Sequence, residues 1–427
     1  MKVIKNGYVV SPANKLEGFY DIYIEKNIIE KIVKNDGDAP IKLADKYVEA
    51  EVIDAKGLTV MPGLIDVHSH FRDPGFEYKE DILTGAKAAA AGGYTTVVLM
   101  CNTKPTVDNA DTLLYVLNKG QNTKIKVESC GAVTIGLKGE ELTDFAKLKE
   151  AGAVGFTDDG IPLMNEELLR KAFREAGDYP ISLHEEDKAF IKENGVNHGK
   201  ASEYYNIYGS PREAEISLIK RDLKVAIEEN GLVNVQHIST KEGVELVREA
   251  RKKSNRVHAE ATPQHIALTE DAVIKYGTNG KLNPPFREET DRQAIIAGLK
   301  DETIDIIATD HAPHSCEEKA KNITEAPSGI IGLETAFAIV NTVLVKEEGM
   351  SLSDVVAKLT VNPARLYGLD RGVIEEGKAA DMAIADLDEK WIVKEFKSKS
   401  SNSPFTGREL IGRIRMTICD GEVVYSV

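Results

Sequence analysis

Short apolar runs alternate with helix-like stretches through the middle of this 427-residue chain. The helix-like stretches, such as PREAEISLIKRDLKVAIEENG, repeat apolar residues every three or four positions and often end in glycine. This alternation is typical of a parallel sheet with crossover helices, and eight strands predict an α/β fold of the (β/α)8 TIM-barrel type. The eight runs span residues 58–68, 94–101, 125–133, 153–157, 179–184, 232–237, 256–262 and 304–309.

The two ends of the chain carry a different pattern. The pattern of residues 1–57 predicts short strands separated by turns. The same pattern occurs again from about residue 372, with an Asp-Gly turn at 420–421. We therefore expect the termini to pair into one small β-sandwich domain. The expected division is a composite β-domain of residues 1–57 plus 366–427 and a barrel of residues 58–365.

Histidines and aspartates gather where the runs end. In a barrel all carboxyl ends of the strands open onto one face, so residues far apart in sequence converge there. Two residues apart on a strand share a face, so both histidines of the His-Ser-His motif should point the same way. Four imidazoles with carboxylates on one rim predict a metal site, mononuclear or binuclear. The residues are His68, His70, Asp158, Asp159, His184, His237 and Asp310.

Other ionisable residues near the runs have simpler interpretations. His198 lies in a polar loop and should be at the surface, whereas His258 and His265 flank the seventh run and should have supporting or structural roles. Acidic residues that follow ligand positions are expected to be solvated on so acidic a protein. These are Asp73, Glu77, Glu185, Glu186 and Asp187.

The net charge of −15 argues against nucleic acid and anionic membranes as partners, because both require a basic face. An anionic substrate would then need local cations, and Arg72 lies four residues after His68 on the predicted rim. We find no apolar stretch of about 18 residues and no secretory or transit pattern at the N-terminus. Four cysteines without CxxC spacing fit reduced thiols, so a cytoplasmic location is expected.

Several motifs in register resemble the amidohydrolase superfamily and, within it, the dihydroorotases that combine a barrel with a β-domain. The similarity covers essentially the whole chain. HxH alone is a weak signal, but the set is specific. The motifs are GLIDVHSHFRDPG, MCNTKPT, FTDDG, SLHEED, QHIST, LNPPFR and ATDHAPHSCEEK.

The resemblance implies a cofactor of two zinc ions. It assigns His68 and His70 to one zinc and His184 and His237 to the second, with an aspartate of FTDDG in place of the carbamylated lysine of many superfamily members. Alignment favours Asp159 over Asp158 for that role. Asp310 would bind the first zinc and act as the catalytic acid/base. Cys101 stands where proline is more usual, and we interpret it as a packed residue rather than a ligand.

The same resemblance implies a reversible hydrolysis of dihydroorotate to N-carbamoyl-aspartate, the ring-closing step of pyrimidine biosynthesis, with zinc-activated water as the nucleophile. Arg72, Asn102 and His314 would hold the substrate carboxylate, and Asn283 would contact its amide edge. The polar segment 315–333, next to Asp310, is a candidate lid.

Alternatives remain open at this point. Hydantoinases and allantoinases share the barrel and HxH, but Arg72, CNTKP and His314 indicate a substrate with a carboxylate. A mononuclear deaminase would not need the bridging aspartate. A non-catalytic partner in a pyrimidine-synthesis assembly should have lost ligands, and none is missing here. The expected partner is a small-molecule substrate, and the resemblance leaves a homodimer or an association with an aspartate carbamoyltransferase open.

Overall fold

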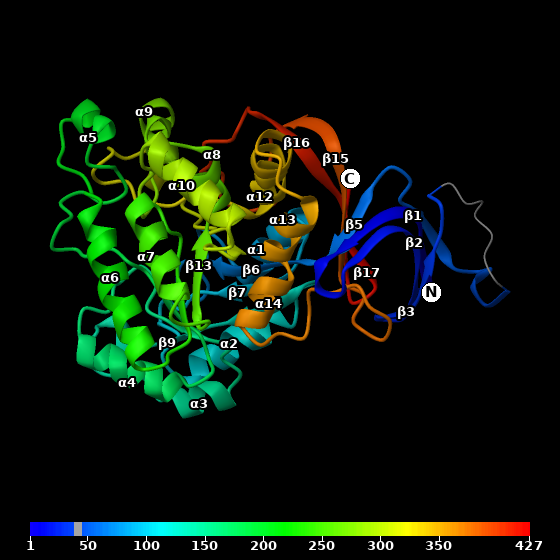
Figure 1. Cartoon of the computed structure of the whole chain (residues 1–427), viewed down its shortest axis with the longest axis horizontal. Coiled ribbons are helices and arrows are strands. Elements are labelled where there is room, and N and C mark those ends of the chain that lie inside the picture. Colours follow the sequence, from blue (N-terminus) through cyan, green and yellow to red (C-terminus); the bar gives the residue numbers. More distant parts are fainter. Residues whose placement is uncertain (38–44) are drawn as a thin grey trace.

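The computed structural model describes residues 1–37 and 45–427 and consists of a barrel beside a sheet built from both chain ends (Figure 1). The barrel strands form two parallel sheets, ordered β14-β13-β12-β11-β10-β9 and β6-β7-β8. β8 and β9 are separated only by Cys130 and together count as one barrel strand. Within the described residues the two sheets therefore provide eight barrel strands. The strands are β6 (Leu64–Ser69), β7 (Tyr94–Leu99), β8 (Lys126–Ser129), β9 (Gly131–Ala132), β10 (Phe156–Thr157), β11 (Ile181–Leu183), β12 (Val233–Val235), β13 (Val257–Ala261) and β14 (Ile306–Ile307).

The barrel closes between its first and last strands, β6 and β14. Ser69 and His311 form a parallel bridge, and the His70 N–H donates to the His311 carbonyl at 2.9 Å. The buried Asp66 carboxylate accepts from the Thr309 N–H at 2.8 Å and from the Thr309 hydroxyl at 2.7 Å. These contacts fix the end of β6 beside the end of β14, and the (β/α)8 prediction is confirmed.

Helices cover the outside of the barrel (Figure 1). Their ends follow local sequence signals: Asp81 caps α1 through a capping box with Thr84, and Thr240 caps α7 by accepting from the Gly243 N–H. These helices are α1 (Ile82–Ala91), α2 (Ala110–Gly120), α3 (Phe145–Glu150), α4 (Glu166–Ala176), α6 (Glu213–Glu228), α7 (Lys241–Arg251), α10 (Glu289–Lys300), α12 (Leu333–Val340), α13 (Leu352–Leu359) and α14 (Val361–Leu366). Short helices α5 (Lys200–Tyr205), α8 (Pro263–Ala267), α9 (Asp271–Tyr276) and α11 (Cys316–Lys319) lie in the connections.

The chain ends join in one sheet of order β17-β16-β15-β5-β1-β2-β3, with β4 paired to β1. The Ile29 N–H donates to the Lys378 carbonyl at 2.9 Å, so β3 folds back toward the segment before β15. One apolar cluster, which includes Ile22, Ile29 and Ile418, fills the curved sheet. The strands are β1 (Lys2–Ser11), β2 (Leu16–Glu25), β3 (Ile28–Lys34), β4 (Glu51–Asp54), β5 (Thr59–Pro62), β15 (Met382–Ile392), β16 (Glu409–Cys419) and β17 (Glu422–Ser426).

The first predicted run, residues 58–68, contains two strands rather than one. β5 pairs with β1 and β15 in the terminal sheet, whereas β6 begins the barrel at Leu64. Gly63 joins them, and a Cβ there would lie 2.1 Å from the Thr95 hydroxyl oxygen, so only glycine fits this close passage. Because the run is apolar on both sides of Gly63, its sequence did not indicate that the chain passes here from the terminal sheet into the barrel.

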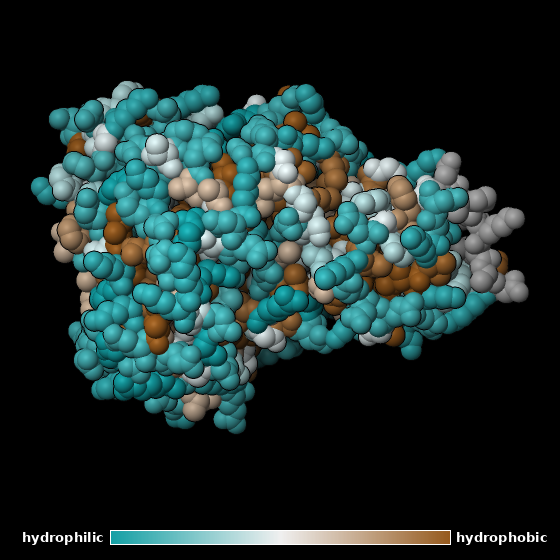
Figure 2. Space-filling view, in the orientation of Figure 1, coloured by the Kyte–Doolittle hydropathy of each residue, from teal (hydrophilic) through white to brown (hydrophobic). Residues whose placement is uncertain are grey.

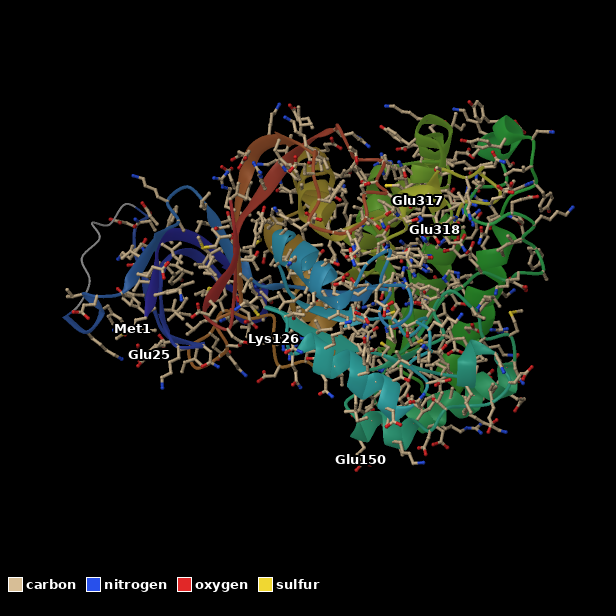
Figure 3. The ribbon with its side chains drawn as sticks, turned by 180° about the vertical axis from the view of Figure 1, so that it is seen from behind. Met1, Glu25, Lys126, Glu150, Glu317 and Glu318 are labelled. Atoms are coloured by element: carbon tan, nitrogen blue, oxygen red, sulfur yellow. The ribbon has the colours of Figure 1, made fainter. Side chains whose placement is uncertain are left out.

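None of the helices within the described residues is long and apolar enough to cross a bilayer. Figure 2 shows a largely hydrophilic barrel half, with apolar side chains gathered over the terminal sheet. Figure 3, from behind, labels Lys126 at the junction of the two parts and Glu317 and Glu318 on the segment after β14.

Candidate metal centre and substrate pocket

His68 and His70 project from the end of β6 to one side of the strand, with ring centroids 5.4 Å apart. The Nε2 atoms of His68 and His70 lie 3.6 Å and 3.1 Å from Asp310 Oδ1. Both rings and the carboxylate are buried. Their ligand atoms are close enough together to hold one metal ion.

His184 and His237 follow β11 and β12 and meet a few ångströms away. His184 Nδ1 lies 2.9 Å from His237 Nε2, so two ring nitrogens face the same point. Asp159 Oδ1 lies 3.6 Å from the first nitrogen and 3.8 Å from the second. This arrangement offers a second set of metal ligands.

Asp159 lies between the two sets. Its Oδ1 is 3.4 Å from His68 Nε2, and its Oδ2 is 3.4 Å from His70 Nε2. Asp158 points elsewhere: its carboxylate accepts from the N–H groups of Val133 at 2.8 Å and Thr134 at 3.0 Å. Asp158 therefore holds the loop after β9, and only Asp159 of the pair faces the four histidines.

The charges of the cluster depend on one another. Burial opposes a charged imidazolium, but Asp159 and Asp310 outweigh it and raise the pKa of His68 well above its usual value. In His184 burial is likewise outweighed, and Asp159 and Glu186 raise its pKa to about 9. The surrounding histidines hold the pKa of Asp159 well below its usual range despite its burial. Without metal the site thus carries protons that a cation would displace.

Buried carboxylates orient two of the rings. Glu260, on β13, places Oε2 3.0 Å from His68 Nδ1, and Glu186 places Oε2 3.2 Å from His184 Nε2. In each ring the opposite nitrogen then faces the cluster. Among the described residues, His68 Nε2 is buried without a hydrogen-bond partner. An orphaned ring nitrogen facing two carboxylates fits a metal ligand.

The expectation of solvated acidic residues was wrong for three positions. Glu185, Glu186 and Asp73 are all buried. Glu186 also accepts from the Ser210 hydroxyl at 3.2 Å, and Asp73 forms an ion pair with Lys119 at 2.6 Å. For Glu186 and Asp73, partners from distant parts of the chain compensate the burial of charge, and sequence spacing does not reveal them.

Below His68 a series of hydrogen-bonded polar side chains crosses the barrel interior. The Asn234 amide donates to Glu260 and, at 3.1 Å, to the Ser182 hydroxyl. Ser182 in turn lies 2.7 Å from the Tyr367 hydroxyl, which follows α14 at the far end of the barrel. Glu260 is thus fixed from below as well as by His68.

A pocket of about 290 Å³ opens above the cluster. Of the predicted metal-type residues all but His68 and Asp158 line it, together with all four predicted substrate contacts: Arg72, Asn102, Asn283 and His314. Sequence reasoning missed further lining residues, among them Gly160, Asn194, Pro327, Ser328 and Gly329. Segment 315–333, the expected lid, supplies the last three, so it forms one wall of the pocket.

One side of the pocket is cationic. The Arg72 guanidinium donates through Nε to the Pro313 carbonyl at 3.2 Å and lies 3.5 Å from His314 Nε2. Lys79 Nζ lies 3.4 Å from His314 Nδ1. Burial, Arg72 and Lys79 lower the pKa of His314, so the ring is neutral and its Nε2–H donates to the Ser328 carbonyl at 2.9 Å. These residues meet the requirement for local positive charge on an acidic protein.

The two predicted asparagines differ in their present partners. Asn102 Oδ1 lies 3.0 Å from His70 Nδ1, and its amide nitrogen donates to Asp159 Oδ2 at 3.1 Å. Asn102 therefore also orients the cluster. Asn283 Oδ1 is buried and, within the described residues, has no hydrogen-bond partner. It is therefore available to a molecule in the pocket.

Three site residues adopt left-handed backbone conformations: Arg72, His237 and Asp310, with φ of 60°, 32° and 45°. Non-glycine residues rarely occupy this region, and such conformations concentrate at functional sites. Each of them directs a side chain into the pocket from a strand end. No local sequence signal marked these turns.

The remaining candidates have structural partners. Cys101 is buried and donates to the Thr157 carbonyl at 2.9 Å, as expected for a packed residue. His265 is buried between Thr262 and the Pro284 carbonyl, and burial and His237 lower its pKa to about 4. His258 pairs with Asp305 at 2.6 Å, and His198 is exposed.

Comparisons with known proteins agree with this geometry. The model of the amidohydrolase family matches residues 59–424. A dihydroorotase of Clostridium acetobutylicum is 50% identical over 100% of this chain and 99% of its own length, and one of Clostridioides difficile is 48% identical over the full length of both. Among solved structures, an L-hydantoinase of Arthrobacter aurescens superimposes with a TM-score of 0.86 at 27% identity, covering 100% of this chain and 96% of that one.

Proposed function

This chain belongs to the amidohydrolase family and, within it, to the dihydroorotases, and on that premise we propose that it catalyses the reversible hydrolysis of L-dihydroorotate to N-carbamoyl-L-aspartate. The observation that carries the proposal is the pairing of the Asp159-centred cluster with a cationic pocket wall. The cluster suits hydrolysis of an amide, and Arg72 suits a substrate that carries a carboxylate.

We propose two zinc ions as the cofactor, one held by His68, His70 and Asp310 and one by His184 and His237, with Asp159 shared. The orphaned Nε2 of His68 and the facing nitrogens of His184 and His237 support this fit. Nitrogen and carboxylate ligands are those that zinc prefers. Zinc in such a site supplies Lewis acidity, which lowers the pKa of water and polarises a carbonyl.

Asp310 is the proposed general acid/base. It lies at the floor of the pocket, and its carboxylate is within 3.1 Å of His70 Nε2. The pKa of Asp310 is lowered because His68 and His70 outweigh the effect of burial, so the carboxylate is ionised, which is the form that can accept a proton. It would take the proton of the attacking water and deliver it to the departing ring nitrogen. Ring closure follows the same path in reverse.

Arg72, Asn102 and His314 are the proposed contacts of the substrate carboxylate. The planar guanidinium of Arg72 suits bidentate pairing, and the Arg72 and Lys79 cations lie on the same side as His314. Asn283, with its unpartnered Oδ1, is the proposed contact of the substrate amide edge.

A hydantoinase activity is the closest alternative, and the fold alone does not exclude it. The hydantoinase structures share the architecture at 27% identity or less, whereas the dihydroorotases are about twice as similar in sequence. The cationic wall around Arg72 favours a substrate that carries a carboxylate over an uncharged hydantoin ring. A non-catalytic role is disfavoured because all of the expected ligand residues are present and converge.

Parallel assays of purified zinc-loaded protein with dihydroorotate, hydantoin and allantoin test the proposal. We expect turnover of dihydroorotate, with hydantoin and allantoin at least about a hundredfold slower, because a site built around a charged contact rejects analogues that lack it. Preferred turnover of either of the other substrates would overturn the assignment.

We also propose a cytoplasmic location, supported by four unpaired cysteines, three of them buried. For quaternary structure we keep both a homodimer and an association with an aspartate carbamoyltransferase as proposals. For the domain division we propose the expected composite β-domain of residues 1–57 and 366–427, extended to residue 62 because β5 pairs with β1 and β15, and a barrel that begins at residue 63 rather than 58 and ends at 365.

A further inference from the structure

The connection between β15 and β16 leaves the terminal sheet and returns to the barrel. Residues 393–408 form a closed loop whose base is tied by the Val393 N–H to the Arg408 carbonyl at 3.0 Å. Figure 1 shows this segment, in red, reaching over the barrel toward α8. Ser398 and Lys399 contact the buried Glu80, and the Ser400 hydroxyl donates to the Lys79 carbonyl at 2.7 Å. The loop, which we call the 393–408 loop, therefore packs behind the pocket.

Asn402 is a polar residue of this loop that is only 4% exposed. Its Nδ2 donates to the carbonyls of Ala312 and Gly329, each at 3.0 Å. Its Oδ1 accepts from the His314 N–H at 3.1 Å. One side chain thus joins two separate parts of the pocket lining. These are residues 312–314, which follow Asp310, and the wall that contains Gly329.

The backbone of Asn402 adds a fourth tie, because its carbonyl accepts from the Ile331 N–H at 3.1 Å. Gly329 leaves no slack between the joined segments. A Cβ at Gly329 would lie 2.8 Å from Ala312 Cβ and 2.9 Å from His314 Cδ2. A shift of either segment would therefore move the His314 ring.

The far side of the same wall is anchored independently. Lys281 donates to the carbonyls of Ile323 and Ala326, each at 2.7 Å, and Lys319 donates to those of Pro327 and Gly329, each at 3.0 Å. Through these bonds Lys281 and Lys319 fix residues 323–329 of the wall in place. The His314 ring donates to the Ser328 carbonyl of this wall at 2.9 Å, and Asn402 of the 393–408 loop adds a second side-chain link, from the Gly329 carbonyl to the Ala312 carbonyl and the His314 N–H.

We propose that Asn402 is a positioning residue for substrate binding, through which the terminal sheet sets the place of His314 and Gly329 in the pocket. The inference rests on the proposed function, because it assigns His314 to the substrate carboxylate. Only a carboxamide supplies two donor hydrogens and an acceptor in one short side chain. An aspartate keeps the shape and the acceptor but loses both donors.

Asn402→Asp and Asn402→Ala, compared with Asn341→Asp, test the proposal. Asn341 is the matched control: it is buried, and its amide also donates to two carbonyls, those of Leu387 at 3.0 Å and Ile411 at 2.9 Å, at the junction with the terminal sheet. For Asn402→Asp we expect the KM for dihydroorotate to rise about tenfold or more, with zinc content retained and kcat changed much less. For Asn341→Asp we expect a lower melting temperature and an unchanged KM.

Hydrogen exchange of the His314 amide supplies a readout that does not depend on activity. Asn402→Ala removes the acceptor of this N–H and should speed its exchange, whereas Asn402→Asp should protect it nearly as well as the natural chain. A natural KM in folded Asn402→Asp, or unchanged exchange in Asn402→Ala, would overturn the role of Asn402. If the natural chain does not turn over dihydroorotate but exchange changes as expected, the proposed function fails and the link between the segments stands.

Discussion

His68 Nδ1 lies 3.0 Å from Glu260 Oε2, so the opposite nitrogen of the ring faces Asp159 and Asp310. A carboxylate partner of this kind fixes the tautomer and orientation of a ligand histidine. The Asn234 amide holds the other oxygen of Glu260, so the carboxylate has little freedom to turn.

We predict that Glu260→Gln weakens zinc binding about 10- to 100-fold, because the amide is a poorer acceptor for the ring N–H. Zinc retained after dialysis against a graded chelator measures the effect. Glu128→Gln is the control, since Glu128 pairs with Arg371 at 2.7 Å on β8, outside the cluster. Equal zinc retention in the two variants would show that Glu260 does not support the site.

Asp310→Asn should fold normally and lose turnover by about 10²- to 10⁴-fold, because an amide cannot accept the proton of the attacking water. Circular dichroism and steady-state kinetics check the two halves of this expectation. Asp305→Asn, before β14 and paired with His258, is expected to keep its turnover. Turnover of Asp310→Asn close to the natural level would remove Asp310 from the proton transfer.

Arg72→Lys should raise the KM for dihydroorotate about tenfold and leave kcat nearly unchanged, because an ammonium cannot pair with a carboxylate through two parallel bonds. Arg371→Lys, remote from the pocket, serves as the matched control. An unchanged KM would indicate that the substrate carboxylate binds elsewhere.

Zinc affinity should rise with pH. The pKa of His184 is raised to about 9 and that of His68 is also raised, so below these values zinc must displace protons from the ligand rings. Competition with a chelator whose own proton binding is known, from pH 6 to 8, measures the slope. Affinity that is independent of pH after this correction would contradict the charge state inferred for the cluster.

The sequence was sufficient to predict the barrel and where its chemistry lies. His68, His184, His237 and Asp310 end or follow predicted strands, and barrel geometry alone requires such residues to converge. The choice of Asp159 over Asp158 came from family resemblance, since both residues follow the same strand. The structure distinguishes them by partner, because Asp158 is engaged by Val133 and Thr134.

Other features had no local signal. Glu260 sits inside the seventh run, where a glutamate in a buried strand is the only hint, and its partner His68 is 192 residues away. Asn402 lies in a polar connection without periodicity, so its contacts with Ala312 and Gly329 depend on how the terminal sheet docks on the barrel. The burial of Glu186 and Asp73 likewise depends on partners from distant elements.

The most direct test of the central claim is dihydroorotate turnover measured while zinc is titrated into metal-stripped protein. The account predicts no turnover in the stripped chain, a rise with added zinc and a plateau near two equivalents. Full activity without metal, or no turnover of dihydroorotate at any zinc level, would contradict it.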